Sequence, residues 1–236
     1  MTLTIKGWNE TSLLDWDGKI VTTLYVGGCN FRCPFCHNFQ LVESPDSLPT
    51  ISVETIEAYL LAHRDFIDGI CLTGGEPCLY KKSGLLDFLQ QIKELGFLIK
   101  LDTNGADPDC LAVLCQQKLV DYLAMDIKAP LDKTYEKLTA VTIDLQKISA
   151  SIKLIINSGI AYEFRTTVVP PWIGEKEISA IAKSITGASS WVLQQFVPAN
   201  CWAEDLRRQQ PYSEPEFNHL VAAAQLILPT TRVRGI

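Results

Sequence analysis

The sequence lacks several features of exported, membrane-spanning and nucleic-acid-binding proteins. Its first 16 residues contain no apolar segment of a secretory signal. Apolar runs such as LIINSGIAY are far shorter than the roughly 20 residues needed to cross a bilayer. No run of five basic residues occurs, and the net charge of −6 disfavours nucleic acid and anionic membranes as partners. We therefore expect a cytoplasmic protein with no nucleic-acid or membrane partner.

Internal repeats and Gly/Ser linkers are also absent, which favours a single domain over residues 1–236. Short β-branched runs alternate with helix-like segments, and this alternation is typical of an α/β fold with a parallel sheet. The expected core spans about residues 19–196, followed by a helical C-terminal segment at about 197–236. Expected strands are 19–28, 69–75, 97–104, 120–128, 162–170 and 190–196. Expected helices are 53–63, 83–95, 108–118, 144–158, 176–185 and 214–227, with N-caps at Ser83 and Ser213 and terminal glycines at Gly96 and Gly159.

Polar segments follow five of the expected strands at or near their carboxyl ends. They read GGCNFRC, TGGEPC, DTNG, MDIK and FRTTVVPP. Active sites of parallel α/β folds lie at this edge of the sheet. The pattern therefore predicts a functional site built from these five segments.

The first of these segments has three closely spaced cysteines and no fourth. Thiolates favour zinc or iron–sulfur chemistry, and a closed site normally has four protein ligands. Cys29, Cys33 and Cys36 could hold zinc with His37 as the fourth ligand, or an iron–sulfur cluster with one open iron. The remaining cysteines are interpreted as buried apolar residues, with Cys78 left undecided: Cys71, Cys78, Cys110, Cys115 and Cys201.

The segment CNFRCPFC, with Phe35 before the last cysteine, resembles the signature of the radical S-adenosylmethionine (radical SAM) superfamily. The segments TGGEP (73–77), LDTNG (101–105), MDIKAP (125–130) and EFRTTVVP (163–170) resemble those of glycyl-radical-enzyme activating proteins. The likeness covers about residues 7–196 and is strongest to activating proteins of anaerobic ribonucleoside-triphosphate reductases.

This resemblance implies a partial (β/α)6 TIM-like barrel and an enzyme with one 4Fe-4S cluster. Cys29, Cys33 and Cys36 would hold the cluster, and SAM would bind its remaining iron. Phe35, Gly74, Gly75 and Glu76 would be among the SAM-binding residues. A reductant such as flavodoxin or ferredoxin would supply the electron that cleaves SAM. The resulting 5′-deoxyadenosyl radical would abstract hydrogen from a glycine of a partner glycyl-radical enzyme.

Five further residues are candidate SAM contacts. Lys128 suits the SAM carboxylate and Asp126 a ribose hydroxyl, with an Asp–Lys surface pair as the alternative. Arg165 lies in an apolar strand, so it either pairs with a buried acid or faces the ligand, and the resemblance favours the ligand. The resemblance places a monovalent cation near Asp102. Asn104 belongs to the same segment, although Asn-Gly is also a plain turn signal.

Other functions remain open at this point. A small-molecule radical SAM enzyme, such as a 7-carboxy-7-deazaguanine synthase-like protein, would carry a similar cysteine loop. Non-catalytic iron–sulfur and structural zinc proteins are further alternatives. The segment VLQQF also has glutamines, Gln194 and Gln195, where several activating proteins have a SAM-contacting histidine.

Overall fold

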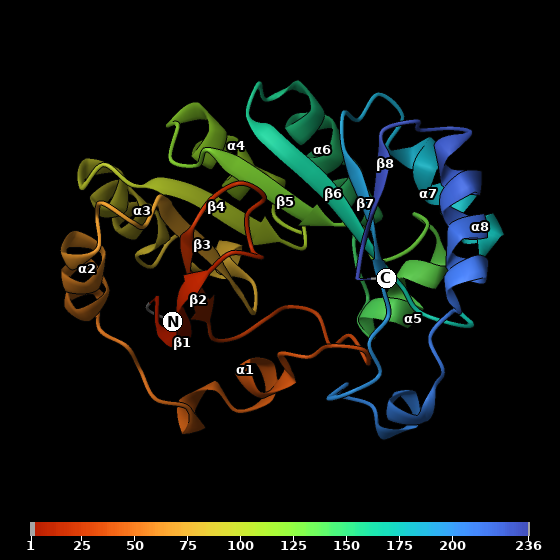
Figure 1. Ribbon diagram of the computed structural model, residues 1–236, viewed down its shortest axis with the longest axis horizontal. Coiled ribbons are helices and arrows are strands. Elements are labelled where there is room, and N and C mark those ends of the chain that lie inside the picture. The colour runs from red at the N-terminus through yellow and green to blue at the C-terminus, as the bar shows by residue number, and fades with distance from the viewer. Residues whose placement is uncertain (1–2, 236) are drawn as a thin grey trace. The chain divides into compact units, whose positions relative to one another are not determined.

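The computed structural model describes residues 3–235, in which eight strands form one sheet in chain order (Figure 1). Strand β1 pairs antiparallel with β2, whereas β2–β3, β3–β4, β6–β7 and β7–β8 are parallel pairs. The mostly parallel sheet confirms the α/β class and is consistent with a partial TIM-like barrel. The strands are β1 Ile5–Ser12, β2 Val21–Val26, β3 Gly69–Gly74, β4 Leu98–Thr103, β5 Tyr122–Asp126, β6 Ala161–Val168, β7 Trp191–Gln195 and β8 Thr231–Arg234.

Helices connect most of the parallel strands. The α-helices are α1 Phe39–Glu43, α2 Val53–Ala62, α3 Leu85–Glu94, α4 Pro108–Gln116, α5 Lys133–Thr139, α6 Leu145–Asn157, α7 Glu175–Ser184 and α8 Glu214–Gln225. The 3-10 helices are η1 Pro45–Ser47, η2 Pro77–Tyr80 and η3 Glu204–Arg208. Within residues 3–235, no helix combines the length and apolar character that crossing a membrane requires.

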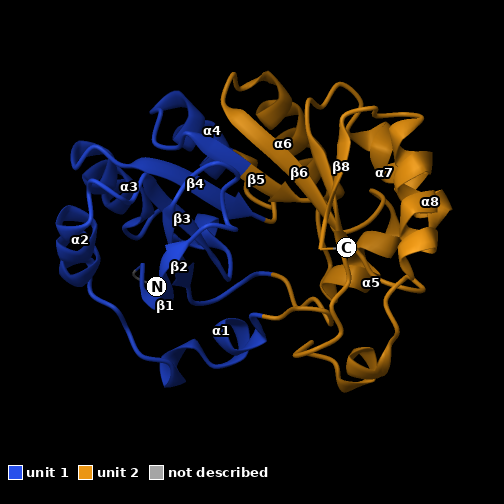
Figure 2. Cartoon of the chain, in the orientation of Figure 1, with its two compact units in different colours: residues 1–30, 38–103, 109–123 blue, residues 31–37, 104–108, 124–236 orange. Residues whose placement is uncertain are grey.

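The chain divides into two compact units (Figure 2). Unit 1 contains the described residues up to 30 together with 38–103 and 109–123. Unit 2 contains residues 31–37, 104–108 and the chain from 124 onward. The cysteine-bearing loop is shared, because Cys29 belongs to unit 1 while Cys33 and Cys36 belong to unit 2. The single-domain expectation from the sequence stays a prediction.

Unit 1 is built on strands β2 to β4 and the helices that follow them. Strand β2 is buried at all but one of its positions, as a β-branched parallel strand covered on both faces should be. Helix α3 buries Leu85, Phe88, Leu89 and Ile92, whose i, i+3, i+4, i+7 spacing places them on one face. These elements fix the carboxyl ends of β2 and β3, which are followed by the polar segments GGCNFRC and TGGEPC.

Unit 2 is built on β6 to β8, with α7 and α8 packed against each other (Figure 1). Trp191 of β7 is fully buried, and its indole Nε1 donates to Thr166 Oγ1 at 3.1 Å. The same hydroxyl donates to the carbonyl of Ile127 at 2.9 Å. A buried hydrogen-bond chain therefore positions β6 and the segment after β5, which carry the expected site residues Arg165 and Lys128.

The six expected strands and six expected helices are all present, but the ends of the sheet were not foreseen. The sequence pattern did not predict four elements, because they are short or largely polar: β1, β8, α1 and α5. The C-terminal segment is consequently not only helical. Ser83 was the wrong N-cap, since Gly84, with φ of +109°, precedes α3. Ser213 is confirmed at α8, where Glu216 Oε2 accepts from its amide at 2.8 Å.

Candidate cofactor-binding site

The three expected cluster ligands lie in a loop, residues 27–38, that separates β2 from α1 and is called the cysteine loop below. None of these three cysteines is part of a disulfide; Cys33 is buried, whereas Cys29 and Cys36 are partly exposed. Burial raises the pKa of the Cys33 thiol to about 11, and the nearby Lys128 ammonium offsets only part of that rise. The amide of Cys36 donates to the carbonyl of Cys33 at 3.0 Å, so a tight turn joins the last two cysteines.

The start of the cysteine loop is fixed by the TGGEP loop, residues 73–77, within unit 1. The amide of Glu76 donates to the Gly28 carbonyl at 2.8 Å, and the amide of Gly75 donates to the Val26 carbonyl at 2.9 Å. Beyond the TGGEP loop, the buried Tyr80 hydroxyl donates to the Gly27 carbonyl at 2.6 Å. Three consecutive carbonyls before Cys29 are therefore held by one neighbouring segment.

The glycines of this loop are required by that close approach. A Cβ at Gly75 would lie 1.8 Å from the Gly28 carbonyl oxygen. Gly74 has φ of +108°, and its Cβ would lie 2.7 Å from the Val26 amide nitrogen. The resemblance implies that both glycines bind SAM. In the structure, their lack of a side chain lets the backbone of this loop pack against the backbone of residues 25–28, just before Cys29. The SAM-binding role of both glycines stays a prediction.

Glu76 is almost completely buried and holds the backbone that follows it. Its Oε1 accepts from the amide of Cys78 at 3.0 Å and from Thr103 Oγ1 at 2.9 Å. The carboxylate therefore caps η2 and ties it to the end of β4. Cys78 is itself buried, and a hydrogen bond with Cys110 raises the pKa of its thiol, ahead of burial. A SAM-binding role for Glu76 stays a prediction.

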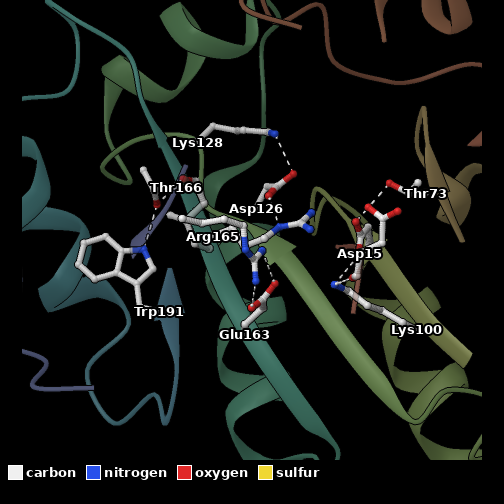
Figure 3. Close-up of polar contacts among 12 residues, drawn as sticks. Asp15, Thr73, Lys100, Asp126, Lys128, Glu163, Arg165, Thr166 and Trp191 are labelled. Atoms are coloured by element: carbon white, nitrogen blue, oxygen red, sulfur yellow. Dashed lines mark hydrogen bonds and ion pairs between the residues drawn. The ribbon is translucent and has the colours of Figure 1, made fainter. Parts of the chain in front are cut away.

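Asp102 belongs to a partly buried polar cluster in unit 1 that the sequence analysis only partly foresaw. Figure 3 labels three other members of this cluster, Asp15, Thr73 and Lys100. Thr73 Oγ1 donates to its Oδ2 at 3.2 Å, and Lys100 Nζ lies 3.7 Å from its Oδ1. Lys100 also donates to the Asp15 carbonyl and lies 5.4 Å from the centroid of the Tyr122 ring. Lys100 was missed, although a lone charge in the apolar run LIKL is the same signal that singled out Arg165.

Asn104 lies at the turn after β4, within unit 2. Its Oδ1 accepts from the Ala106 amide at 3.0 Å, which closes an Asx turn. Gly105 completes the turn with φ of +74°, and a Cβ there would lie 2.0 Å from Met125 Cε. These contacts support the turn interpretation of Asn-Gly, while a SAM contact from Asn104 stays a prediction.

Asp126, Lys128 and Arg165 come together in unit 2 (Figure 3). Lys128 Nζ lies 3.0 Å from Asp126 Oδ2, and Arg165 Nε lies 2.9 Å from Asp126 Oδ1. Burial alone would raise the pKa of Asp126, but Arg165 and Lys128 outweigh it and hold that pKa below its ordinary value. Arg165 therefore pairs with a partly buried acid, and its contact with a ligand stays a prediction. Lys128 Nζ also lies 5.8 Å from the Phe35 ring centroid, next to the cysteine turn.

The donor set fits an iron–sulfur cluster better than a Cys₃His zinc site. His37 Nε2 lies 2.8 Å from the Val197 carbonyl, so that ring nitrogen is committed to a hydrogen bond. In the part of the chain that the structure describes, no three His, Cys, Asp or Glu side chains form a group arranged to hold a metal ion. That finding covers the three cysteines as well, so the fit of a cluster rests on the spacing of three thiols on one short loop, with the Lys128 ammonium close to Cys33.

The chain is similar to known proteins over most of its length. Residues 23–185 match the family model of the radical SAM superfamily. A Methanocaldococcus jannaschii protein, provisionally named a glycyl-radical enzyme activating enzyme, is 30% identical over 240 residues, covering 100% of this chain and 98% of its own. A 7-carboxy-7-deazaguanine synthase of Thermococcus kodakarensis is 29% identical, covering 70% of this chain and 61% of its own.

Among solved structures, a domain of the pyruvate-formate lyase-activating enzyme of Bacteroides vulgatus superposes with a TM-score of 0.57. It is 18% identical, and the match covers 71% of this chain and 99% of that one. At this identity the likeness supports the fold alone. The family match itself covers well over half of the sequence, and it shows that this chain is an enzyme of the radical SAM superfamily.

Proposed function

We propose that this protein is an activating enzyme for a glycyl-radical enzyme. The observation that carries the proposal is the full-length likeness to a protein provisionally given that function, over 100% of this chain. The chain also has a single cysteine loop, which suits one cluster. Anaerobic ribonucleotide reductase is the partner that the sequence resemblance favours, with flavodoxin or ferredoxin as reductant.

Cys29, Cys33 and Cys36 would supply the three protein ligands of a 4Fe-4S cluster. When bound, the cluster and SAM supply a one-electron reductive cleavage that yields the 5′-deoxyadenosyl radical for hydrogen abstraction from a glycine Cα. The chain's task is to bind and orient these groups and to keep water away from them. Buried Cys33 and the fixed carbonyls of residues 26–28 suit that task.

Lys128 would bind the SAM carboxylate as a preorganised cation. Asp126 holds its ammonium at 3.0 Å and raises the pKa of Lys128 against the opposing effect of burial, so this side chain stays protonated. Asp126 in turn is held by Arg165 at 2.9 Å. We assign Lys128 and Asp126 to direct SAM contact, and Arg165 to holding Asp126 in place. Phe35, Gly74, Gly75, Glu76 and Asn104 complete the proposed SAM-binding set.

A monovalent cation beside Asp102 is the remaining expectation from the sequence resemblance. Lys100 already brings a positive charge to 3.7 Å from Asp102 Oδ1. A metal cation at this carboxylate would lie close to that ammonium and experience repulsion from it. Replacing K⁺ by choline in the assay buffer tests the expectation, since a cation-dependent enzyme would lose activity.

A second candidate function is the synthesis of a small molecule, as in the 7-carboxy-7-deazaguanine synthases that this chain also resembles. One experiment separates the two. The reconstituted protein is incubated anaerobically with SAM and either a ribonucleotide reductase whose glycines are deuterated or a reduced pterin. Activation predicts deuterium in 5′-deoxyadenosine and a glycyl-radical EPR signal. Turnover of the pterin, with no radical on any tested glycyl-radical enzyme, would support the synthase instead.

A further inference from the structure

The middle of the cysteine loop has no regular secondary structure. Between Val26, the last residue of β2, and Phe39, the first of α1, the chain forms neither helix nor strand. Such a loop must be ordered by contacts from elsewhere, because fixing each residue costs conformational entropy. For residues 31–37, which lie in unit 2, those contacts come from two other segments of the same unit.

A segment far away in the sequence supplies most of them. After β7 the chain passes back along the cysteine loop, where the Ala203 amide donates to the Pro34 carbonyl at 2.8 Å. The Trp202 amide donates to the Cys36 carbonyl at 3.1 Å, and the buried Cys201 thiol lies 3.8 Å from the Phe35 carbonyl. Three successive residues of one segment thus contact three successive carbonyls around the last cysteine.

Two further contacts hold the ends of the same stretch. The Arg32 amide donates to the Thr139 carbonyl at 2.8 Å, at the end of α5. His37 Nε2 lies 2.8 Å from the Val197 carbonyl, a few residues before the contacting segment. The turn from Cys33 to Cys36 is therefore held on both sides and along its length.

The contacting segment is itself locked by one side chain. Arg207 Nε donates to the Cys201 carbonyl at 2.7 Å, and its Nη2 donates to the Trp202 carbonyl at 3.4 Å. These bonds come from a charged donor and fix two peptide groups. The amides of the same two peptide groups, those of Trp202 and Ala203, donate to the cysteine loop. Leu206, which is buried, anchors the 3-10 helix η3 that presents Arg207. The adjacent Arg208 is also exposed but donates to neither of these carbonyls.

We propose that residues 201–207 form a clasp over the cluster-binding turn, and that Arg207 is the positioning residue that keeps the clasp closed. Its function is to hold the backbone turn that carries Cys33 and Cys36 and to limit access of water and oxidants to the iron bound there. The inference rests on the proposed cluster. Arg207 acts through the Cys201 and Trp202 carbonyls and contacts neither the cluster nor SAM.

The test measures how fast the cluster loses iron. Full-length wild type, Arg207→Gln, Arg207→Lys and the matched control Arg208→Gln are reconstituted anaerobically, and iron release to bathophenanthroline is followed by absorbance. Loss of the charged hydrogen bonds predicts release faster by a factor of about 5 to 30 in Arg207→Gln. Arg207→Lys, which keeps one donor, should be intermediate. Arg208→Gln should match wild type.

Thermal unfolding of the cluster-free proteins shows whether each variant folds. A second variant, Trp202→Pro, removes the amide that donates to Cys36 and should accelerate iron release without touching Arg207. EPR spectra of the reduced clusters should broaden in both variants, because a loosened turn no longer fixes one ligand geometry. Equal release from Arg207→Gln and Arg208→Gln would overturn the clasp. Failure of wild type to take up a cluster would instead overturn the proposed function.

Discussion

Replacing Gly75 by alanine should damage the site through packing rather than through backbone strain. The new Cβ would lie 1.8 Å from the Gly28 carbonyl oxygen and 2.6 Å from its carbon, so the TGGEP loop must move away from residue 28. Overpacking of this kind costs about 1–3 kcal/mol. The movement also weakens the bonds to Val26 and Gly28, each contributing about 0.5–1.5 kcal/mol.

Removing a glycine opposes this loss by about 0.4–1 kcal/mol through the entropy of the unfolded chain. The net expectation is a loss of about 1–5 kcal/mol in the free energy of unfolding, measured by urea denaturation of the cluster-free protein. Because Gly28 precedes Cys29, the variant should also take up less iron per chain on reconstitution. Iron and sulfide analysis measures that second effect.

Two glycines of unit 1 provide controls. A Cβ at Gly69, at the opposite end of β3, would lie 2.2 Å from the Leu98 carbonyl oxygen, so Gly69→Ala is a comparable clash away from the cysteine loop. It should lose stability but bind iron normally once folded. Gly7→Ala places its Cβ no closer than 3.9 Å to other atoms and should be neutral within about 0.5 kcal/mol. Normal iron binding by folded Gly75→Ala would refute the reasoning.

Two further substitutions test the buried charges. Lys100→Met removes the ammonium that lies 3.7 Å from the buried Oδ1 of Asp102 and should cost about 3–5 kcal/mol in urea unfolding, because the carboxylate loses this compensating charge; a loss below about 1 kcal/mol would contradict this. Asp126→Asn should destabilise the protein mainly at neutral pH. The folded-state pKa of Asp126 is depressed, so its stabilisation is present above the unfolded pKa of about 3.9 and is lost as pH falls below that value. The gap between wild type and variant in urea midpoint should therefore be larger at pH 7 than at pH 3, and a constant gap would contradict the assignment.

The core of the fold could be predicted because its strands and helices carry strong periodicity. Helix α3 shows the i, i+3, i+4, i+7 apolar spacing, and β2 is a nearly continuous β-branched run. Strand β8 could not be found in this way, since TRVR has two charged residues among four. It is held by distant parts of the chain: it pairs with β7, and Arg234 makes two bonds of 3.1 Å to the buried Glu163 of β6. Local pattern carries no information on such a pairing.

The candidate site was predictable in composition but not in how its parts support one another. The spacing of Cys29, Cys33 and Cys36 was visible in the sequence, and so was the charge of Arg165 within an apolar strand. The contact of Gly75 with Gly28 was not, because it depends on how closely two loops approach. Arg207 was equally invisible, since its partners are backbone carbonyls and its role follows only from the path of residues 201–207.

The most direct test of the account is SAM cleavage by the reconstituted protein. Wild type and Cys33→Ala are loaded anaerobically with iron and sulfide, reduced with dithionite and given SAM, and 5′-deoxyadenosine is quantified by chromatography beside the EPR spectrum. We predict 5′-deoxyadenosine from wild type, none from Cys33→Ala, and a change in the wild-type EPR signal when SAM binds. A normal cluster in wild type whose EPR signal is unchanged by SAM, with no SAM cleaved, would contradict the account.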